Sequence, residues 1–197
     1  MVESKTLSEM ALEELWQLFP IILKEHNPEY AKWYEEEKEN LTSIVGGKNI
    51  RRISHIGSTA VPNLLAKPTV DILMEISADC DMIDLKEKLS ASGFICMSES
   101  YVPERAYVFN KGYTEEGFAA RVFHLHVRYL SDPDELYFRD YLIAYPEAAR
   151  QYAELKRDLK KKYEHNRDAY TQSKTAFVDR YTKKARREFE NKYAGPK

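Results

Sequence analysis

The segment from His55 to Glu75 constrains the fold and the function of this chain more than any other. It reads HIGSTAVPNLLAKPTVDILME, which predicts a strand, a Gly-Ser turn, a short helical segment and a second strand that carries an acid. Gly57 allows the backbone to turn where a side chain would clash. We therefore expect two neighbouring strands whose connection brings a turn of small residues near the carboxylate of Asp71.

The same segment contains the groups that a phosphate site needs. Ser58 and Thr59 supply hydroxyls and backbone N–H groups where a helix is expected to begin, and a helix start favours an anion. Lys67 adds a positive charge, and Asp71 is a candidate ligand for the metal of a metal-bound nucleotide. The alternative is an ordinary turn between two strands with an exposed aspartate.

The motif HIGSTAVPNLLAKPTVDI closely resembles the signature of the GrpB family, predicted members of the nucleotidyltransferase superfamily. Further segments resemble other parts of that family in the same order: NPEYAKWYEEEKENL, FHLHVRYL, FRDYLIAYPEAARQYAELKRDL and YTQSKTAFV. Together they cover roughly residues 27 to 180. The resemblance implies an α+β fold with a nucleotidyltransferase-like mixed β-sheet, helices packed against it and an extra N-terminal helix.

Local patterns along the chain agree with this fold class. Capping residues and apolar stripes predict helices before the motif and again from Asp132 onward, with a block of strands between them. We expect an N-terminal helical extension over residues 1–26, a GrpB-like domain over 27–185 and a charged tail over 186–197.

Composition argues against several classes of protein. The net charge is −2, so the chain lacks the global basic field of a nucleic-acid binder. No apolar run reaches the length of a membrane span, and the N-terminus lacks the pattern of a signal peptide. Cys80 and Cys96 have no metal or redox spacing, which favours a reduced, cytoplasmic setting. We expect no membrane and no obvious nucleic-acid partner, and the oligomeric state stays open.

Asp71 is the expected metal ligand, but its surroundings depart from the superfamily pattern. In that superfamily two or three carboxylates hold two magnesium ions, which bind the triphosphate. The second acidic position is occupied here by Leu73, which cannot ligate a metal. Glu75 lies on the same strand face, roughly 13 Å away at the usual strand rise, and its alternative is a surface acid at a strand end. One-metal binding and nucleotide binding without turnover are therefore open alternatives.

The HLH tripeptide provides a second candidate cluster. His124 and His126 project to one face of a strand, about 7 Å apart, where they can flank a metal or another bound group. The alternative is a pair of core histidines that are satisfied by hydrogen bonds. His55 precedes the Gly-Ser turn and is positioned to join them. Asp71 with these histidines would suit zinc, manganese or iron, so we expect a divalent metal: magnesium or manganese, with zinc as an option.

Basic residues outside the motif are candidates for phosphate contact. Lys174 falls on the aromatic stripe of Tyr170 and Phe177 in the last expected helix, so it must either extend to solvent or meet an anion. In resembling families a lysine on a later helix can contact the nucleotide phosphates. Arg121 and Arg105 flank the expected hairpin strands and have the geometry for bidentate phosphate binding, with a surface position as the alternative for Arg105.

The resemblance implies metal-dependent transfer of a nucleoside monophosphate from a nucleoside triphosphate to an unknown acceptor. In that mechanism Gly57 and Ser58 cradle phosphates, and Asp71 holds the metal. Lys174 and an arginine, for which Arg121 is the candidate, neutralise developing charge. Some family relatives are fused to dephospho-coenzyme A kinase, which hints at nucleotide or coenzyme A metabolism.

Two other functions fit the same residues. The first is a non-catalytic module that binds a nucleotide or a coenzyme, and Leu73 is its main support. The second is a metal-dependent hydrolase built on Asp71 with His55, His124 and His126. Transfer requires a second acid near Asp71, whereas the hydrolase requires the histidines and Asp71 to converge within reach of one metal.

Overall fold

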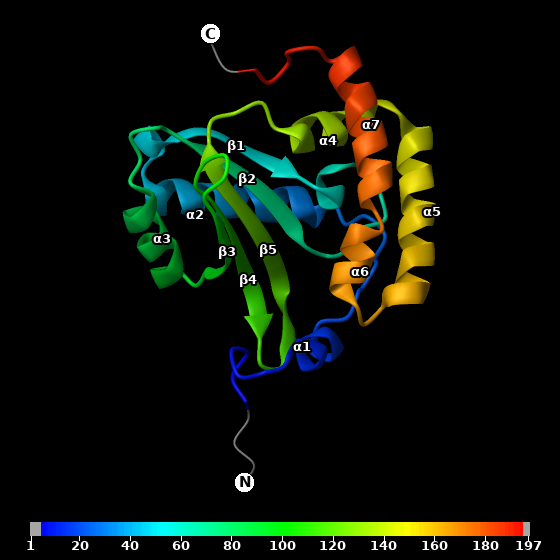
Figure 1. The fold of residues 1–197 in the computed structure, drawn as a ribbon, viewed down its shortest axis with the longest axis horizontal. Coiled ribbons are helices and arrows are strands. Elements are labelled where there is room, and N and C mark those ends of the chain that lie inside the picture. The colour runs from blue at the N-terminus through cyan, green and yellow to red at the C-terminus, as the bar shows by residue number, and fades with distance from the viewer. Residues whose placement is uncertain (1–4, 195–197) are drawn as a thin grey trace.

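The computed structural model describes residues 5–194 and contains a five-stranded mixed sheet with helices on both faces (Figure 1). The strands are β1 (Ile50–Ile56), β2 (Val70–Ile76), β3 (Ile95–Ser100), β4 (Ala106–Thr114) and β5 (Gly117–Tyr129). Their order across the sheet is β1-β2-β5-β4-β3. The β2–β5 pair is parallel and the other neighbouring pairs are antiparallel. The expected α+β class with a mixed sheet is therefore confirmed.

Helices precede, interrupt and follow the strands. They are α1 (Leu12–Leu18), α2 (Glu29–Val45), α3 (Met82–Ala91), α4 (Asp134–Ala144), α5 (Pro146–Tyr163), α6 (Arg167–Gln172) and α7 (Thr175–Glu188). Two short 3₁₀ turns, η1 (Gly47–Asn49) and η2 (Ser58–Ala60), flank β1. Within residues 5–194 no helix is both long and apolar enough to cross a membrane.

Helix starts follow local capping chemistry. Asp81 caps α3 by accepting hydrogen bonds from the backbone N–H groups of Ile83 and Asp84. Pro146 stands in the first turn of α5, where its missing N–H has no partner to lose. Asn166 caps α6 by accepting from the N–H of Ala169 at 2.9 Å. This last cap fixes the start of the short helix that supplies several side chains to the candidate site.

The alternation of β2 places its side chains on two different faces of the sheet. Ile72 and Met74 face a large core that includes residues of α2 and α3. Leu73 points to the other face, where it is fully buried and packs with Ile56 and with Leu136 of α4. The helices α4 to α7 lie on this second face, to the right of the sheet in Figure 1.

Glu75 is a structural residue of the second face. Its carboxylate is fully buried and lies 2.5 Å from Nε of Arg52, and it accepts hydrogen bonds from the N–H and the hydroxyl of Ser131. The alternative of a surface acid at a strand end is therefore wrong. The carboxylate is committed to an internal ion pair, because Arg52 enters from the neighbouring strand.

The last helical region is divided into two helices. α6 ends at Gln172 and α7 begins at Thr175, with Lys174 as the residue before the first turn of α7. The single aromatic stripe expected across this region is therefore interrupted. Residues 186–194, expected to belong to a charged tail, contact α4 and the segment before it: Arg186 pairs with Asp132 at 2.7 Å, and the N–H of Tyr193 donates to the hydroxyl of Tyr137 on α4.

Candidate functional site

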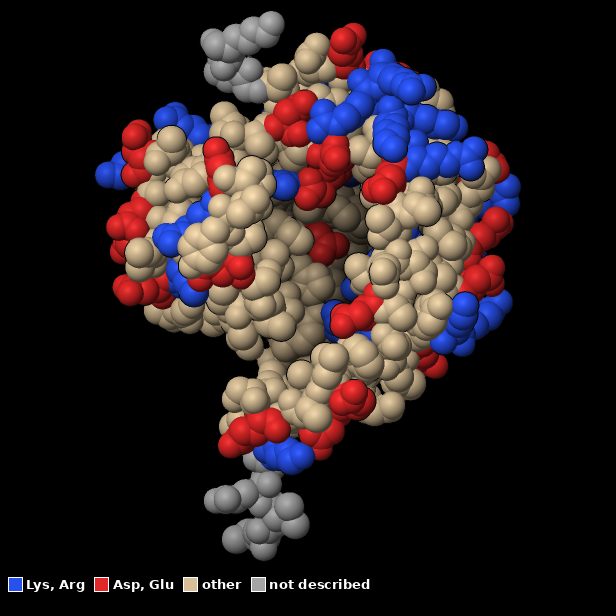
Figure 2. Space-filling model, in the orientation of Figure 1, with Lys and Arg blue, Asp and Glu red and all other residues tan. Residues whose placement is uncertain are grey.

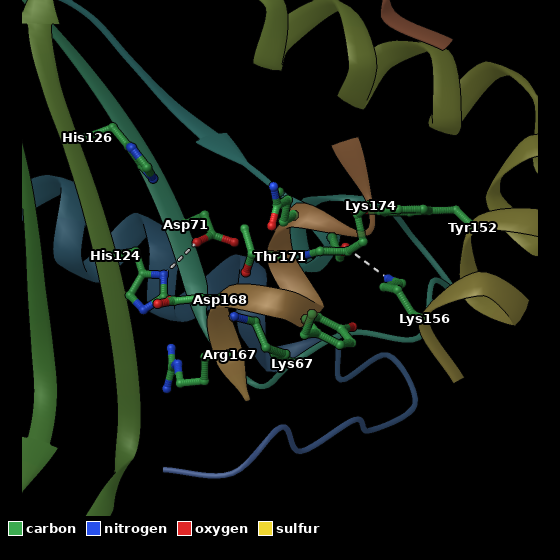
Figure 3. Close-up of a pocket in the computed structure, with 14 residues that line it drawn as sticks. Lys67, Asp71, His124, His126, Tyr152, Lys156, Arg167, Asp168, Thr171 and Lys174 are labelled. Atoms are coloured by element: carbon green, nitrogen blue, oxygen red, sulfur yellow. Dashed lines mark hydrogen bonds and ion pairs between the residues drawn. The ribbon is translucent and has the colours of Figure 1, made fainter. Parts of the chain in front are cut away.

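A cavity of about 700 Å³ lies between the second face of the sheet and the helices α5 and α6 (Figures 2 and 3). Its side chains come from the η2 turn, β2, β5, α5, α6 and the α6–α7 link. Four basic residues and two acids line it: Lys67, Lys156, Arg167, Lys174, Asp71 and Asp168. Gly57, Ser58, His124 and His126 complete the wall formed by the sheet and the turn. Two segments of the sequence motif and the HLH strand thus meet at one place.

Gly57 and Asp71 are in direct contact at the base of this cavity. Gly57 has a φ of 70° and a ψ of −170°, a combination that is open to glycine and costly for other residues. A Cβ atom built on Gly57 would overlap Oδ2 of Asp71 and lie 2.9 Å from its Cγ. The glycine is therefore required by the carboxylate as well as by the turn.

Asp71 ends a chain of hydrogen bonds that begins at Arg167. Arg167 Nη2 donates to the hydroxyl of Tyr113 at 2.8 Å. The Tyr113 hydroxyl lies 2.7 Å from Nε2 of His124, whose Nδ1 lies 3.2 Å from Oδ1 of Asp71. Because the guanidinium can only donate, the simplest arrangement has Tyr113 donating to Nε2 and His124 donating through Nδ1 to the carboxylate. Figure 3 shows the last of these contacts as a dashed line.

The charges and burial of the residues in this hydrogen-bond network keep Asp71 ionised and His124 neutral. Burial alone would raise the pKa of Asp71, but its hydrogen bond with His124 and the positive charge of Lys67 outweigh burial and lower the pKa. Burial lowers the pKa of His124, against the opposing effect of Asp71. Burial raises the pKa of Tyr113. At neutral pH the cavity thus presents the ionised carboxylate of Asp71, whose hydrogen-bond partner His124 is neutral.

The lysines of the cavity hold their protons weakly. Desolvation, followed by repulsion from Arg167 and Lys174, lowers the pKa of Lys67 to about 7. Desolvation also lowers the pKa of Lys174, against the effect of Asp71. An anion that enters the cavity would reverse these shifts, because it favours the charged forms of the same lysines.

Lys156 is a site residue that our sequence interpretation missed. It is 2% exposed, and its Nζ donates to Oγ of Ser58 at 2.9 Å and to the carbonyl oxygen of Leu65. Burial, then repulsion by Lys174 and Lys67, lowers its pKa well below the ordinary lysine value. A signal was present in the sequence, because Lys156 follows Tyr152 by four residues on the buried stripe of α5.

The hydroxyl of Tyr170 has unused hydrogen-bonding capacity at the cavity. Tyr170 is fully buried and is one of the residues that line the cavity. Within the described part of the chain no hydrogen-bond partner reaches its buried oxygen. A buried hydroxyl usually has a partner, so this group is available to a bound ligand or to water.

His55 and Thr59 belong to the opposite side of the motif. In the β1–β2 register Ile56 is opposite Asp71, so His55 points to the other face of the sheet. Its ring stacks on Tyr34 of α2 at 4.9 Å, and its Nε2 lies 2.9 Å from the hydroxyl of Thr59. Burial lowers the pKa of His55 to about 4. The structure therefore does not bring His55 to His124 and His126, and it directs the Thr59 side chain into the interior.

Arg121 and Arg105 lie away from the cavity, so Arg121 does not have its expected place at the phosphate site, and the alternative applies to Arg105. The guanidinium of Arg121 is 2.5 Å from the carboxylate of Glu36 and is half exposed. Arg105 lies near Glu99, at 3.6 Å. The arginine that does line the cavity is Arg167, at the start of α6.

The donor set of the cavity does not fit the two-metal site of a nucleotidyltransferase. Among residues 5–194 no group of three or more His, Cys, Asp or Glu side chains is arranged to hold a metal ion. Leu73 is buried under α4, and Glu75 is held by Arg52. Asp71 is bonded to His124 and faces lysines, which compete with a cation for the carboxylate. These side chains therefore do not fit a two-metal centre.

Comparison with known proteins identifies close relatives of the chain. The sequence profile of the GrpB protein family matches residues 20–184. UPF0157 protein YqkA of Bacillus subtilis is 34% identical over 165 residues, which are 82% of this chain and 46% of YqkA. Glutamate-rich protein GrpB of Alkalihalophilus pseudofirmus is 32% identical over 163 residues, which are 81% of this chain and 92% of that protein. The chain thus spans about half of the first relative and most of the second.

A solved structure agrees with this comparison. The crystal structure of conserved protein GrpB from Enterococcus faecalis superposes with a TM-score of 0.74 at 27% sequence identity. The match covers 85% of this chain and 99% of that one.

Proposed function

The chain belongs to the GrpB family, and we propose that the cavity of this family member binds the phosphate groups of a nucleotide or of a related small molecule. The observation that carries the proposal is the meeting of four basic side chains around the Gly57–Ser58 turn. They come from the η2–β2 loop, α5, α6 and the start of α7, so only the folded chain assembles them. Basic groups that are partly withdrawn from water bind phosphate more strongly than exposed ones.

Arginine and lysine side chains can contact phosphate in two different ways. Arg167 can offer a planar pair of N–H donors, whereas Lys67 and Lys174 act as point charges. The buried hydroxyl of Tyr170 adds a donor that has no partner among the described residues. The cavity of about 700 Å³ has room for a nucleotide-sized ligand.

The side chains of the cavity support phosphate binding, which is one part of the functions considered. Metal-dependent transfer of a nucleoside monophosphate stays a prediction, because it requires a second carboxylate near Asp71. Leu73 and Glu75 do not supply one. A nucleotide- or coenzyme-binding module needs the basic cavity alone. The same titrations test both, provided that they are made with and without divalent metal.

We expect the protein to bind ATP, coenzyme A or tripolyphosphate in the presence of EDTA, as measured by isothermal titration calorimetry. Lys174→Met should weaken binding about 10–100-fold, the usual effect of losing one charged hydrogen bond. Lys183→Met is the matched control, since Lys183 is exposed on the same helix α7. Equal affinity in the two variants, or no binding of any phosphate compound at millimolar concentration, would remove the proposal. Binding only with magnesium, manganese or zinc would restore the metal-dependent alternatives.

The affinity for tripolyphosphate should fall as the pH rises above 7. Lys67 has a pKa of about 7 in the free protein, so above this pH it is neutral and must take up a proton when the anion binds. Each such proton weakens binding by about tenfold per pH unit until the pKa of the complex is reached. Calorimetry at pH 6 to 9 in two buffers of different ionisation enthalpy measures both the affinity and the proton uptake.

The variant Lys67→Arg isolates the contribution of this residue. Arginine stays protonated throughout the range, so the pH dependence of the variant should be shallower by about one proton. Lys156 and Lys174 also have lowered pKa values. Their titration and that of tripolyphosphate itself are common to both proteins, so the difference in slope between the wild type and the variant reports Lys67. An identical slope in the wild type and in Lys67→Arg would show that Lys67 does not titrate on binding.

A further inference from the structure

Ser58 and Lys156 form a hydrogen-bonded pair at the edge of the phosphate cavity. Their Oγ and Nζ atoms are 2.9 Å apart, although the residues lie on η2 and α5 and are separated by 98 positions in the sequence. The contact is the dashed line at Lys156 in Figure 3. A serine within hydrogen-bonding distance of a base is the arrangement that activates a hydroxyl as a nucleophile.

The environment of Lys156 favours the neutral amine over the ammonium ion. The side chain is 2% exposed, and the partners of its Nζ are the hydroxyl of Ser58 and the carbonyl of Leu65, both of them uncharged. Of the charged groups that act on it, Lys67, Lys174 and Arg157 lower its pKa, and Asp71 acts in the other direction. In the structure Nζ donates both to Oγ of Ser58 and to the carbonyl of Leu65. Once the amine is neutral, it can keep its bond to Leu65 and turn its lone pair toward Ser58, which reverses the direction of the hydrogen bond to Ser58. Lysine bases of this kind are known in other enzymes.

Ser58 is accessible from two sides. It lines the phosphate cavity and also an adjoining cavity of about 400 Å³, which the side chains of Phe138 and Val178 border. The two cavities share Ser58, Asp71 and His126 among their walls. A ligand can therefore extend across the serine, with its phosphates among the lysines and another part in the adjoining space.

We propose that Ser58 is a nucleophile with Lys156 as its general base, and that its substrate is a phosphoanhydride bound in the cavity. The choice of substrate rests on the proposed phosphate binding, whereas the activation of the serine does not. In the reaction Oγ of Ser58 forms a bond to phosphorus and its proton moves to Nζ of Lys156. The bridging P–O bond breaks, and the leaving phosphate departs as an anion that Lys67 and Lys174 stabilise. The product is a phosphoryl ester of Ser58.

A fluorophosphonate tests the nucleophile without depending on phosphate recognition. The probe forms an O–P bond and releases fluoride, so intact mass spectrometry and peptide mapping identify the modified residue. We expect Ser58 to be labelled in the wild type and Ser58→Ala to be unlabelled. Ser90→Ala is the matched control, because Ser90 is exposed on α3. Absence of label on wild-type Ser58 would overturn the proposal.

Two substitutions of Lys156 test whether the residue acts as a general base or only supplies a positive charge. Lys156→Met should slow labelling of Ser58 at least about 100-fold, the usual size of general-base catalysis. Lys156→Arg keeps a charge that cannot be removed near neutral pH, so it should be equally slow. Labelling that Arg restores, or that Met leaves unchanged, would overturn the role of the base. Lys161→Met, an exposed position on the same helix, should label like the wild type, and circular dichroism of each variant verifies its fold.

The outcomes also distinguish this inference from the proposed binding function. If Ser58 is labelled but no phosphate compound binds, the nucleophile stands and the phosphoanhydride substrate fails with the binding proposal. If tripolyphosphate binds to the wild type while Ser58 of the wild type is not labelled, binding stands and the nucleophile fails.

Discussion

Replacing Leu73 with aspartate should destabilise the protein by about 3–5 kcal/mol. The leucine is fully buried against Ile56 and Leu136, so its removal forfeits about 1.5–3 kcal/mol of apolar burial. The new carboxylate must also lose water without gaining a partner, which costs at least as much again unless it is protonated. For a chain of this length the melting temperature should fall by about 6–20 °C. Chemical denaturation followed by circular dichroism measures the change.

This variant tests the two-metal hypothesis directly, because aspartate at this position would complete the D-x-D pattern. We expect no gain of magnesium-dependent nucleotide turnover, since the side chain points under α4 and away from solvent. Leu73→Met, which conserves volume, is the control and should cost less than about 1.5 kcal/mol. A Leu73→Asp protein that is as stable as this control and hydrolyses or transfers nucleotides with magnesium would mean that α4 can leave the sheet.

The strands of this fold could be predicted closely because their signals are local. The sequence predicted one strand on each side of the Gly-Ser turn, and the structure has Ile50–Ile56 and Val70–Ile76. Alternating apolar residues define such strands, and the Gly-Ser turn ends the first of them. The expected hairpin is formed by β4, which continues to Thr114, and β5, which begins at Gly117.

Which residues form the site depends on strand register and on helix packing, and neither can be read directly from the sequence. The place of His55 follows from the β1–β2 register, which sets Ile56 opposite Asp71 and turns His55 away. A shift of that register by one residue would have reversed the outcome. Lys156 reaches Ser58 only because α5 packs against the η2 turn. Its place on the apolar stripe after Tyr152 was the available signal.

The boundary between α6 and α7 changes the structural setting of Lys174. A continuous helix would place it on the stripe of Tyr170 and Phe177. The chain instead ends α6 at Gln172 and begins α7 at Thr175, so Lys174 lies in the link between them. The side chain still lines the cavity. The sequence therefore predicted a site position for Lys174 that the structure also has, but the prediction assumed one continuous helix, which the structure does not contain.

Replacing Gly57 with alanine should destabilise the protein by about 3 kcal/mol and abolish anion binding. A φ of 70° with a ψ of −170° is a combination that essentially only glycine adopts, and it costs an ordinary residue about 1–3 kcal/mol. In addition, the new Cβ would collide with the carboxylate of Asp71, which cannot rotate away without breaking its contact with His124. The displaced carboxylate would enter the space among the lysines and neutralise them. Thermal unfolding and calorimetric titration of tripolyphosphate measure the two effects.

Two further variants separate the strain of the backbone from the collision with Asp71. Gly93 has a φ of 85° and no atom near the position of an added Cβ, so Gly93→Ala reports the cost of a positive φ without a collision, about 1–3 kcal/mol. The double variant Gly57→Ala with Asp71→Ala removes the clashing carboxylate. Because the two residues touch, it should be less destabilised than the sum of the single variants, by about 1 kcal/mol or more. Additive effects would mean that the turn moves freely and that Asp71 does not depend on the glycine for its position.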